Sequence, residues 1–308
     1  MRPSAIGLLA FATLAVSSAA IFIVLSGFDA ASIALWRLGG TVAAFAPFAA
    51  GRLGPSIQAL DARERGLLVA AGVGYGLHFV WWPMGFERTS YESTVVLLAT
   101  QPVLACVLGL VWLGEAVTRR MWIAIAAAAL GLGLLVGRDY AFRPEHLAGD
   151  GIVLASVLAM VVTVLAGRTL RQRLDFPVYA LALASIALAV VVPVVALGAA
   201  APLSTARGPE GWLALALLIA IPTLLGHAGF HYLVKEVPVF YLNLVIVAEP
   251  VIAIALKYAL RARFDAFRDT ALGPWQLAGA AVLLAGVAFG LTERPPGAVA
   301  RVVRARTL

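Results

Sequence analysis

The sequence predicts an all-α membrane protein whose ten transmembrane helices form two inverted five-helix repeats. Three observations predict this fold: the composition, the number of long apolar segments, and a similarity between the two halves of the chain. Of the 308 residues, 62% are hydrophobic and 13% are charged, and the mean hydropathy is +0.96. An average soluble domain has about 25% charged residues, so this composition excludes an ordinary soluble enzyme and a disordered chain. With a single cysteine, Cys106, a disulfide-stapled secreted domain is excluded as well.

Ten apolar segments, separated by short polar or Pro/Gly-marked breaks, are long enough to cross a membrane. A spanning helix needs about 20 apolar residues. The predicted spans are residues 4–26, 30–50, 66–86, 91–113, 119–137, 149–170, 177–198, 211–233, 238–260 and 274–292. The first span is predicted to be a retained helix, because its apolar stretch exceeds the roughly 7–15 residues of a signal-peptide core.

The distribution of basic residues predicts that both termini lie in the cytoplasm. With the N-terminus inside, fourteen Lys and Arg residues fall on the cytoplasmic side and eight fall on the other side. Cytoplasmic loops are generally enriched in Lys and Arg, so topology explains the net charge of +7 without a nucleic-acid partner. Half of the outer basic residues lie in one loop, 257–268, and the basic tail 293–308 is expected to be cytoplasmic.

The second half of the chain resembles the first half. Pro102 in the fourth span and Pro250 in the ninth are 148 residues apart, each follows Gln or Glu, and each span precedes a Trp-led helix. Half of the chain is 154 residues. Because five is an odd number, two copies of a five-helix unit enter the membrane from opposite sides, as in many secondary transporters. We therefore predict one repeat in residues 1–140 and the other in residues 141–308.

Three segments resemble the EamA-type branch of the drug/metabolite transporter (DMT) superfamily. They are ALWRL in the second span, FERTSYESTVVLLATQPVLACVLGLVWLGE across the third and fourth, and VAEPVIAIAL in the ninth. The resemblance implies secondary transport of small metabolites, often amino acids and commonly outward, with spans five and ten at the periphery of the cavity. The chain departs from the family pattern at 257–273, which lacks the Gly-Glu that usually closes the ninth helix, so the resemblance does not describe this loop.

Polar side chains inside the spans indicate where a site could lie, because a charge at the bilayer centre costs about 3 kcal/mol or more. Arg37 is the one arginine that falls well inside a predicted span. We expect a structural charge that snorkels to the interface or pairs with a carboxylate; binding of an anionic substrate group is the alternative. By contrast, the glycine run Gly72, Gly74 and Gly76 predicts close contact between helices.

Two polar groups in the first half are candidates for substrate binding. In the third span Tyr75, His78 and Trp82 lie at i−3, i and i+4 and therefore share one helix face. Such a face could stack a planar or apolar substrate group, and ordinary aromatic packing is the alternative. In the fourth span Thr94 and Gln101 offer a hydroxyl and an amide, which could bind substrate or bond between helices.

A polar stripe follows Pro222 in the eighth span, where Thr223, His227 and His231 occur at i, i+4 and i+8. The histidines are expected to line the cavity or respond to protons, with His227 a proton-coupling candidate; a packed structural pair is the alternative. Together with Glu249 they could hold a metal. Since HAGFH lacks the Glu of the HExxH zinc motif, we predict no metal and no other cofactor.

Glu249, in the middle of the ninth span, is the leading candidate of all. Its carboxylate must be protonated, paired or placed in a wet cavity, which makes it a candidate substrate ligand and proton carrier. Tyr241 lies eight residues earlier and shares a broad face with it at 3.6 residues per turn. The alternative is a bracing residue that pairs with Arg37, Lys257 or a histidine.

These expectations combine into a secondary transporter that is not an enzyme. It would export a small amphipathic metabolite such as an amino acid by alternating access, driven by protons or another gradient, since the chain has no Walker motif. Its partners would be the substrate and the lipid bilayer, and it would lie in a bacterial-type inner membrane as a monomer or homodimer. A flippase for lipids or lipid-linked head groups and an intramembrane metal-dependent enzyme are the alternatives.

Overall fold

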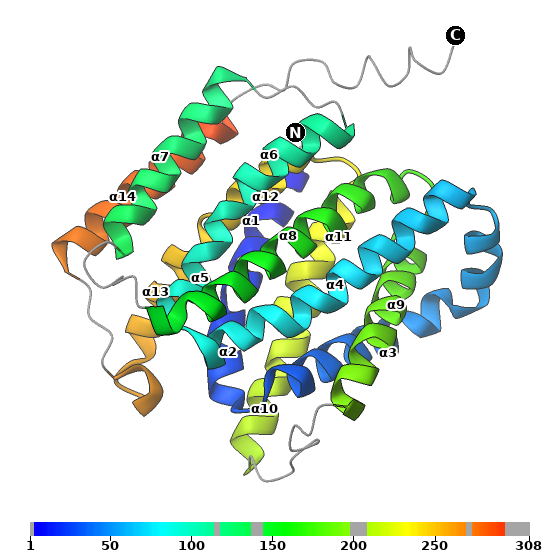
Figure 1. Ribbon diagram of the computed structural model, residues 1–308, viewed down its shortest axis with the longest axis horizontal. Coiled ribbons are helices and arrows are strands. Elements are labelled where there is room, and N and C mark those ends of the chain that lie inside the picture. Colours follow the sequence, from blue (N-terminus) through cyan, green and yellow to red (C-terminus); the bar gives the residue numbers. More distant parts are fainter. Residues whose placement is uncertain (1–2, 114–117, 137–143, 198–207, 269–272, 293–308) are drawn as a thin grey trace.

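The computed structural model describes residues 3–113, 118–136, 144–197, 208–268 and 273–292, and every regular element in these residues is helical (Figure 1). The α-helices are α1 (Pro3–Ser17), α2 (Ala19–Ser26), α3 (Ala30–Gln58), α4 (Ala62–Arg88), α5 (Tyr91–Val96), α6 (Gln101–Leu113), α7 (Arg119–Val136), α8 (Leu147–Leu170), α9 (Phe176–Leu197), α10 (Gly208–Leu218), α11 (Ala228–Leu233), α12 (Val239–Ile246), α13 (Glu249–Leu260) and α14 (Pro274–Leu291). The other elements are the 3-10 turns η1 (Leu97–Thr100), η2 (Pro144–His146) and η5 (Asp265–Phe267) and the π-helix η4 (Ile219–His227).

Nine helical segments within the described residues are long and apolar enough to cross a membrane. They coincide with all of the predicted spans except the fifth and identify a multi-pass membrane protein. A helix suits such a segment because it bonds the backbone N–H and C=O groups internally, as an apolar solvent requires. The predicted fifth span coincides with α7, an 18-residue helix that lies along α14 (Figure 1); that α7 is a tenth span stays a prediction.

Two acidic caps begin the long hairpin of α3 and α4. Asp29 accepts a hydrogen bond from the backbone N–H of Ser32 at 2.9 Å, and Asp61 forms a capping box with Glu64. The α3 helix then continues to Gln58, eight residues beyond the predicted end of its span. Hydropathy marks where the apolar stretch ends, but helical hydrogen bonding continues into the polar residues that follow.

Helices from the two predicted repeats pack against one another. α4 lies against α8 and α9, α3 against α9, and α7 against α14. α1 packs on η4, α2 on α10, and α6 on α12. A Cβ added at Gly74 would lie 2.6 Å from the carbonyl oxygen of Ala159, and one at Gly76 would lie 2.9 Å from that of Ala187. The glycine run of α4 therefore brings this helix onto its neighbours, as its sequence predicts.

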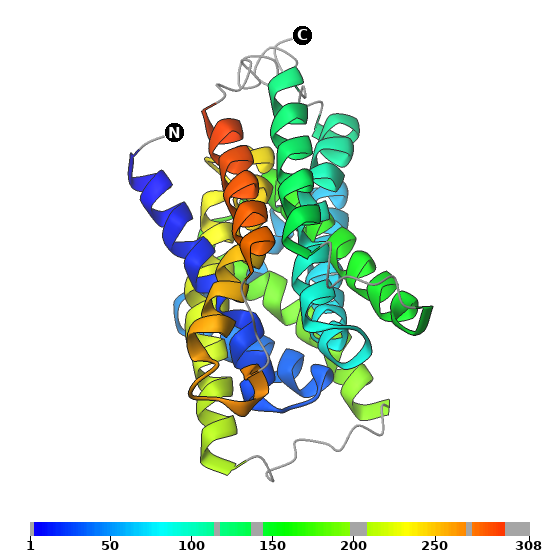
Figure 2. The ribbon, with the colours of Figure 1, turned by 90° about the vertical axis from the view of Figure 1, so that its left-hand side faces the viewer.

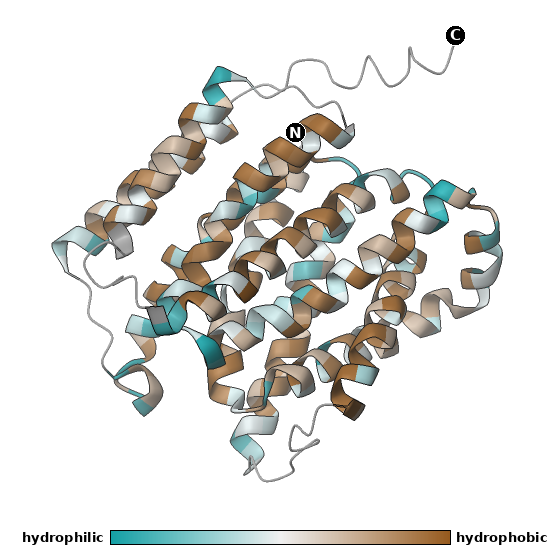
Figure 3. Ribbon diagram, viewed as in Figure 1, coloured by the Kyte–Doolittle hydropathy of each residue, from teal (hydrophilic) through white to brown (hydrophobic). Residues whose placement is uncertain are grey.

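The helix bodies are mostly apolar, and the hydrophilic residues gather towards many helix ends (Figure 3). The start of α1 and the end of α14 lie towards the same end of the bundle (Figure 2). Of the unusual loop 257–273, the structure describes all but 269–272: α13 ends at Leu260 and η5 follows, with Phe267 buried. The predicted repeat boundary at 140/141 and the basic tail 293–308 lie outside the described residues.

Candidate substrate site

Three spans change helix type or break near their middle. The fourth passes from α5 through the 3-10 turn η1 into α6, which begins with Gln101 and Pro102. The ninth is interrupted between α12 and α13, and α13 begins with Glu249 and a proline. The eighth contains the π-helical η4, which includes Pro222. Proline removes a backbone donor, and irregular backbone at membrane depth is tolerated only where it is buried in protein or lines a water-filled cavity.

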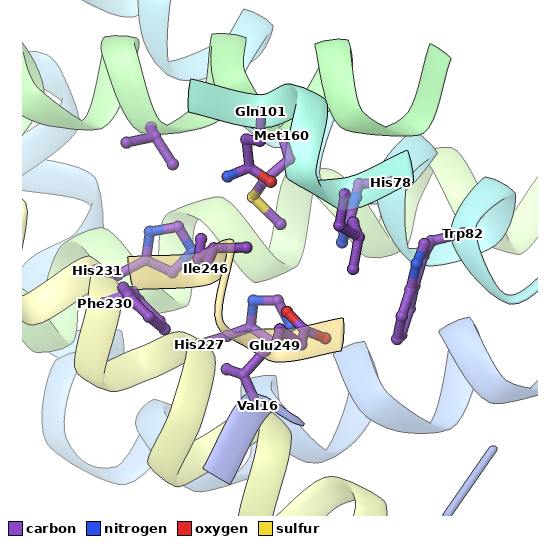
Figure 4. Close-up of a pocket in the computed structure, with 12 residues that line it drawn as sticks. Val16, His78, Trp82, Gln101, Met160, His227, Phe230, His231, Ile246 and Glu249 are labelled. Atoms are coloured by element: carbon purple, nitrogen blue, oxygen red, sulfur yellow. The ribbon is translucent and has the colours of Figure 1, made fainter. Parts of the chain in front are cut away.

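These segments surround a cavity of about 40 Å³ that both predicted repeats line (Figure 4). The lining residues are Val16, His78, Trp82, Leu98 and Gln101 from the first half, and Met160, Val164, His227, Phe230, His231, Ile246 and Glu249 from the second. One buried water needs roughly 10–15 Å³ of such volume. The cavity therefore has room for a few waters, and a metabolite could enter only after the surrounding helices move apart.

His78 and Trp82, both on α4, form an aromatic part of the cavity wall, the His78–Trp82 wall. Their rings are parallel within 8°, with centroids 6.2 Å apart. His78 Nδ1 lies 2.9 Å from Ser156 Oγ and 3.2 Å from the Ser156 carbonyl oxygen, whereas the Trp82 indole N–H donates to the carbonyl of Thr94 at 3.2 Å. Both side chains are thus held at their polar atoms, and both line the cavity.

The two histidines of the eighth span lie on the opposite wall in a chain of ring contacts. His227 is 6.0 Å from His78 and 6.2 Å from Tyr75, and His231 is 5.1 Å from Tyr75 and 5.7 Å from Tyr179, all measured between ring centroids. Within the described part of the chain, the buried Nε2 atom of His231 has no hydrogen-bond partner. The contacts hold the rings in place but leave polar atoms available to a ligand or a water.

Glu249 is the acidic residue of the cavity wall, and only 3% of its surface is exposed. Among the described residues, its carboxylate makes neither a hydrogen bond nor an ion pair. Such a group must be neutral or await a cationic partner, because an unpaired buried charge is costly.

The same part of the chain holds no group of three or more His, Cys, Asp or Glu residues placed to bind a metal, and so no three-ligand set forms around His227 and His231.

Gln101 joins the two halves across the cavity wall. Its Nε2 donates to Asn243 Oδ1 at 2.7 Å, and Asn243 Nδ2 in turn donates to the carbonyl of Val239 at 2.6 Å. Both side chains are fully buried or nearly so. This bond brings the fourth and ninth spans together next to their two breaks.

Arg37 lies deep in the bundle and not at an interface. It is 0% exposed, its Nε donates to Thr223 Oγ1 at 2.8 Å, and its guanidinium carbon sits 4.1 Å from the centroid of the Phe79 ring. Snorkelling, which its position in the sequence allowed, is therefore wrong. No carboxylate of the described chain lies within the 4.0 Å of an ion pair with it.

The structure brings together six of the predicted substrate-binding residues on the cavity wall: His78, Trp82, Gln101, His227, His231 and Glu249. The other four lie behind that wall. Tyr75 contacts both histidines, Thr94 holds the Trp82 indole, Thr223 holds Arg37, and Tyr241 packs beside Phe240.

Two buried polar residues that bond to the cavity wall were not predicted from the sequence. Asn243 bonds to Gln101, and Ser156 bonds to His78, and both are completely buried. Each is an isolated polar residue within an apolar span. That isolation is a usable signal, because a polar side chain in hydrocarbon needs a partner from another helix.

Comparisons with known proteins agree with this geometry. Residues 3–137 match the model of the EamA-like transporter family, which belongs to the DMT superfamily. These residues are an EamA-family segment. The resemblance seen in the sequence is thereby confirmed, and the EamA match covers the helices that supply Gln101 and the His78–Trp82 wall.

A solved crystal structure is similar to the protein over nearly its whole length, with a TM-score of 0.74 and 19% identity. The alignment covers 96% of this chain and 100% of that chain. At this identity the likeness shows the fold alone, which the two chains share in both halves. No curated protein matches the sequence.

Proposed function

We propose that the protein is a secondary transporter that moves a small metabolite by alternating access between residues 1–140 and 141–308. The observation that carries this proposal is the buried cavity, which takes its lining from both halves at the points where their helices break. Transporter sites commonly lie near the midplane, between repeats and beside discontinuous helices. The family match of residues 3–137 supports the same function.

The helix packing supports an inverted repeat. A twofold relation exchanges each span with the span five positions away, so the third exchanges with the eighth and the sixth with the first. The contact of α4 (third span) with α8 (sixth span) then predicts a contact of the eighth span with the first. That second contact exists, as α1 on η4 and α2 on α10. The pairs α3 with α9, α7 with α14, and α6 with α12 map onto themselves. Such pairing is what a twofold relation between two five-helix units requires.

The cavity chemistry supports an amphipathic substrate, such as an amino acid or a related compound. The His78–Trp82 wall offers a surface for an apolar or planar group, and Gln101 and Glu249 offer polar ligands. Glu249 is our candidate for proton coupling, with His227 as its partner on the facing wall. The start of α1 and the end of α14 lie towards the same end of the bundle, which supports two termini on one side of the membrane. We place this side in the cytoplasm of a bacterial-type cell and propose that transport is outward.

Transport across proteoliposome membranes tests this proposal. Uptake of radiolabelled amino acids and related metabolites should be saturable and should depend on the pH gradient. The Glu249→Gln and His227→Ala variants should lose that dependence, because neither can carry the proton. The control is Glu210→Gln, at an exposed position in the first turn of α10. Normal transport by both cavity variants between pH 6 and 8 would refute proton coupling.

A lipid flippase is the second candidate, and one observation favours it. An apolar groove of about 430 Å³ lies between α6 and α8, lined by Thr100, Val103, Leu104, Leu154, Ala155 and Leu158. Thr100 adjoins Gln101 of the cavity wall, so this groove approaches the cavity from the side of the bundle. Movement of fluorescent lipid across vesicles, without uptake of water-soluble metabolites, would favour the flippase over the metabolite transporter.

A further inference from the structure

Arg37 is a buried cation that uses only part of its hydrogen-bonding capacity. Its Nε donates to Thr223 Oγ1, whereas both terminal nitrogens, Nη1 and Nη2, are buried without any hydrogen-bond partner in the described part of the chain. A guanidinium in an apolar interior is stable only when its donors are paired. The two terminal nitrogens, which carry about four of the five N–H donors of a guanidinium, are therefore unpaired in the described chain.

The Nε end of the Arg37 guanidinium is rigidly held. Thr223 Oγ1, which accepts from Arg37, itself donates to the carbonyl of Leu218 at 2.8 Å, so the hydroxyl has a fixed orientation. Phe79 supports the guanidinium through its ring face at 4.1 Å. This leaves the two terminal nitrogens as a fixed fork, the arrangement that binds a planar oxyanion through two parallel hydrogen bonds.

The fork lies one aromatic ring away from the cavity. Phe79 contacts Arg37 on one side and the His227 ring at 5.1 Å between centroids, and His227 lines the cavity. Thr223 precedes His227 by one helical turn in η4. Arg37 itself does not line the cavity, so a substrate reaches the fork only if Phe79 or η4 moves aside as the cavity widens.

The described part of the chain places no carboxylate within ion-pair distance of Arg37. Glu249 is close enough for the two charges to attract each other, but it lies beyond ion-pair distance. The other titratable groups that face Arg37 are Tyr75, His78 and His227, none of which is an anion at neutral pH.

We infer that Arg37 is the anion-binding residue of the transport site, and that the transported molecule carries a carboxylate held by Nη1 and Nη2. The inference rests on the proposed transport function and narrows its substrate class. A carboxylate fits better than a phosphate, because the described cavity wall holds neither lysine nor arginine that could join Arg37 in balancing a dianion. Arginine suits this task better than lysine, since its fork matches a planar carboxylate.

Matched pairs of carboxylates and amides test the inference on the purified full-length protein. The probes are L-leucine and L-leucinamide, 4-methylpentanoate and its amide, and indole-3-propionate and its amide, with binding measured by calorimetry. We expect at least one carboxylate to bind about tenfold or more tightly than its amide, the range of one charge-assisted bond. Arg37→Gln should remove this preference, and Arg37→Lys should retain part of it.

Arg171→Gln is the matched control. Arg171 is also buried, but it donates to the carbonyls of His231 and Leu174 at the end of α8. This control should keep the carboxylate preference. An equal affinity for carboxylates and amides in the wild type, or a preference that survives Arg37→Gln, would overturn the inference.

Thermal stability without ligand separates anion binding from a bracing role. If the fork waits for substrate, Arg37→Met should leave the melting temperature unchanged or raise it, because an uncompensated buried charge is removed. If Arg37 instead braces the fold through Glu249, the melting temperature should fall and the inference is wrong. Carboxylate-selective binding without any flux would refute the transport function alone, whereas flux unaffected by Arg37→Gln would refute the anion site alone.

Discussion

The contact between α7 and α14 and the central cavity are built on opposite principles. We call the first the α7–α14 seam and define it by Gly131 and Gly286 with their neighbours Ala128, Gly279 and Leu283. A Cβ at Gly131 would collide with the backbone nitrogen of Leu283 and lie 2.7 Å from the carbonyl of Gly279. A Cβ at Gly286 would lie 2.8 Å from the backbone nitrogen of Ala128. Two unbroken helices thus touch backbone to backbone.

The cavity wall has the reverse character. Three of its spans are interrupted, and buried polar side chains stand among its apolar ones. In the described chain, His231 Nε2 on the wall and Arg37 Nη1 and Nη2 behind it lack a hydrogen-bond partner. Close packing of small residues gives a contact that resists movement. A region with unpaired polar atoms completes its hydrogen bonds only when it binds a water or a ligand. The difference indicates that the seam carries stability and the cavity carries function.

The largest effect should come from filling the seam. Gly131→Leu is expected to lower the free energy of unfolding by at least about 3 kcal/mol, the upper range for overpacking, because the obstructing atoms are backbone and cannot rotate away. Thermal unfolding of the purified protein measures this change. Gly133→Leu is the control, since a Cβ there meets nothing within 4 Å. Equal melting temperatures for the two variants would show that the seam does not carry stability.

Much of this fold could be predicted from apolar length alone. The nine spans coincide with predicted segments because an interior without water imposes both helix and length. Helix ends are less accessible, as the extension of α3 to Gln58 shows, since polar residues can continue a helix outside the bilayer. Pro222 and Pro250 lie where the structure interrupts its helices, as the missing backbone donor of proline favours, but the sequence does not reveal that η4 is π-helical.

The site was only partly predictable, and Tyr241 shows why. Counting 100° per residue placed it on the face of Glu249, but the helix stops between them at Val247, so the angular count does not carry through. Arg37 shows a second limit. Its partner Thr223 is 186 residues away in sequence, and no local pattern reveals such a contact. Sequence gives the face of a residue on its own helix, but not its depth in the bundle.

A medium effect is expected at the bond between Gln101 and Asn243, which joins the two halves at the cavity wall. Gln101→Leu should lower the free energy of unfolding by about 1–3 kcal/mol, because it leaves the buried Asn243 oxygen unpaired. In a double-mutant cycle with Asn243→Leu, we expect a coupling energy of about 0.6–1.7 kcal/mol, the range for such bonds in membrane proteins. Thr100→Val, which removes a bond within its own helix to Leu97, should show no coupling with Asn243→Leu. Additive effects of the two Leu substitutions would mean that the bond does not join the halves energetically.

The smallest effect on stability is expected at the ion pair of Lys257 and Glu92, which links α13 to α5 at 2.7 Å. The two side chains are 14% and 39% exposed, so Glu92→Gln should lower the free energy of unfolding by less than about 1 kcal/mol. The pair nevertheless joins one half to the other, and the alternating access that we propose would change their relative position. A difference of 1 kcal/mol between two conformations alters their ratio about fivefold, so the transport rate should change by up to that factor.

The exposed pair of Arg268 and Asp265 lies within one half, so Arg268→Gln should change neither stability nor rate. If Glu92→Gln leaves the transport rate unchanged as well, the contact between α13 and α5 does not control the movement of the two halves. The region that moves would then be limited to the residues that line the cavity.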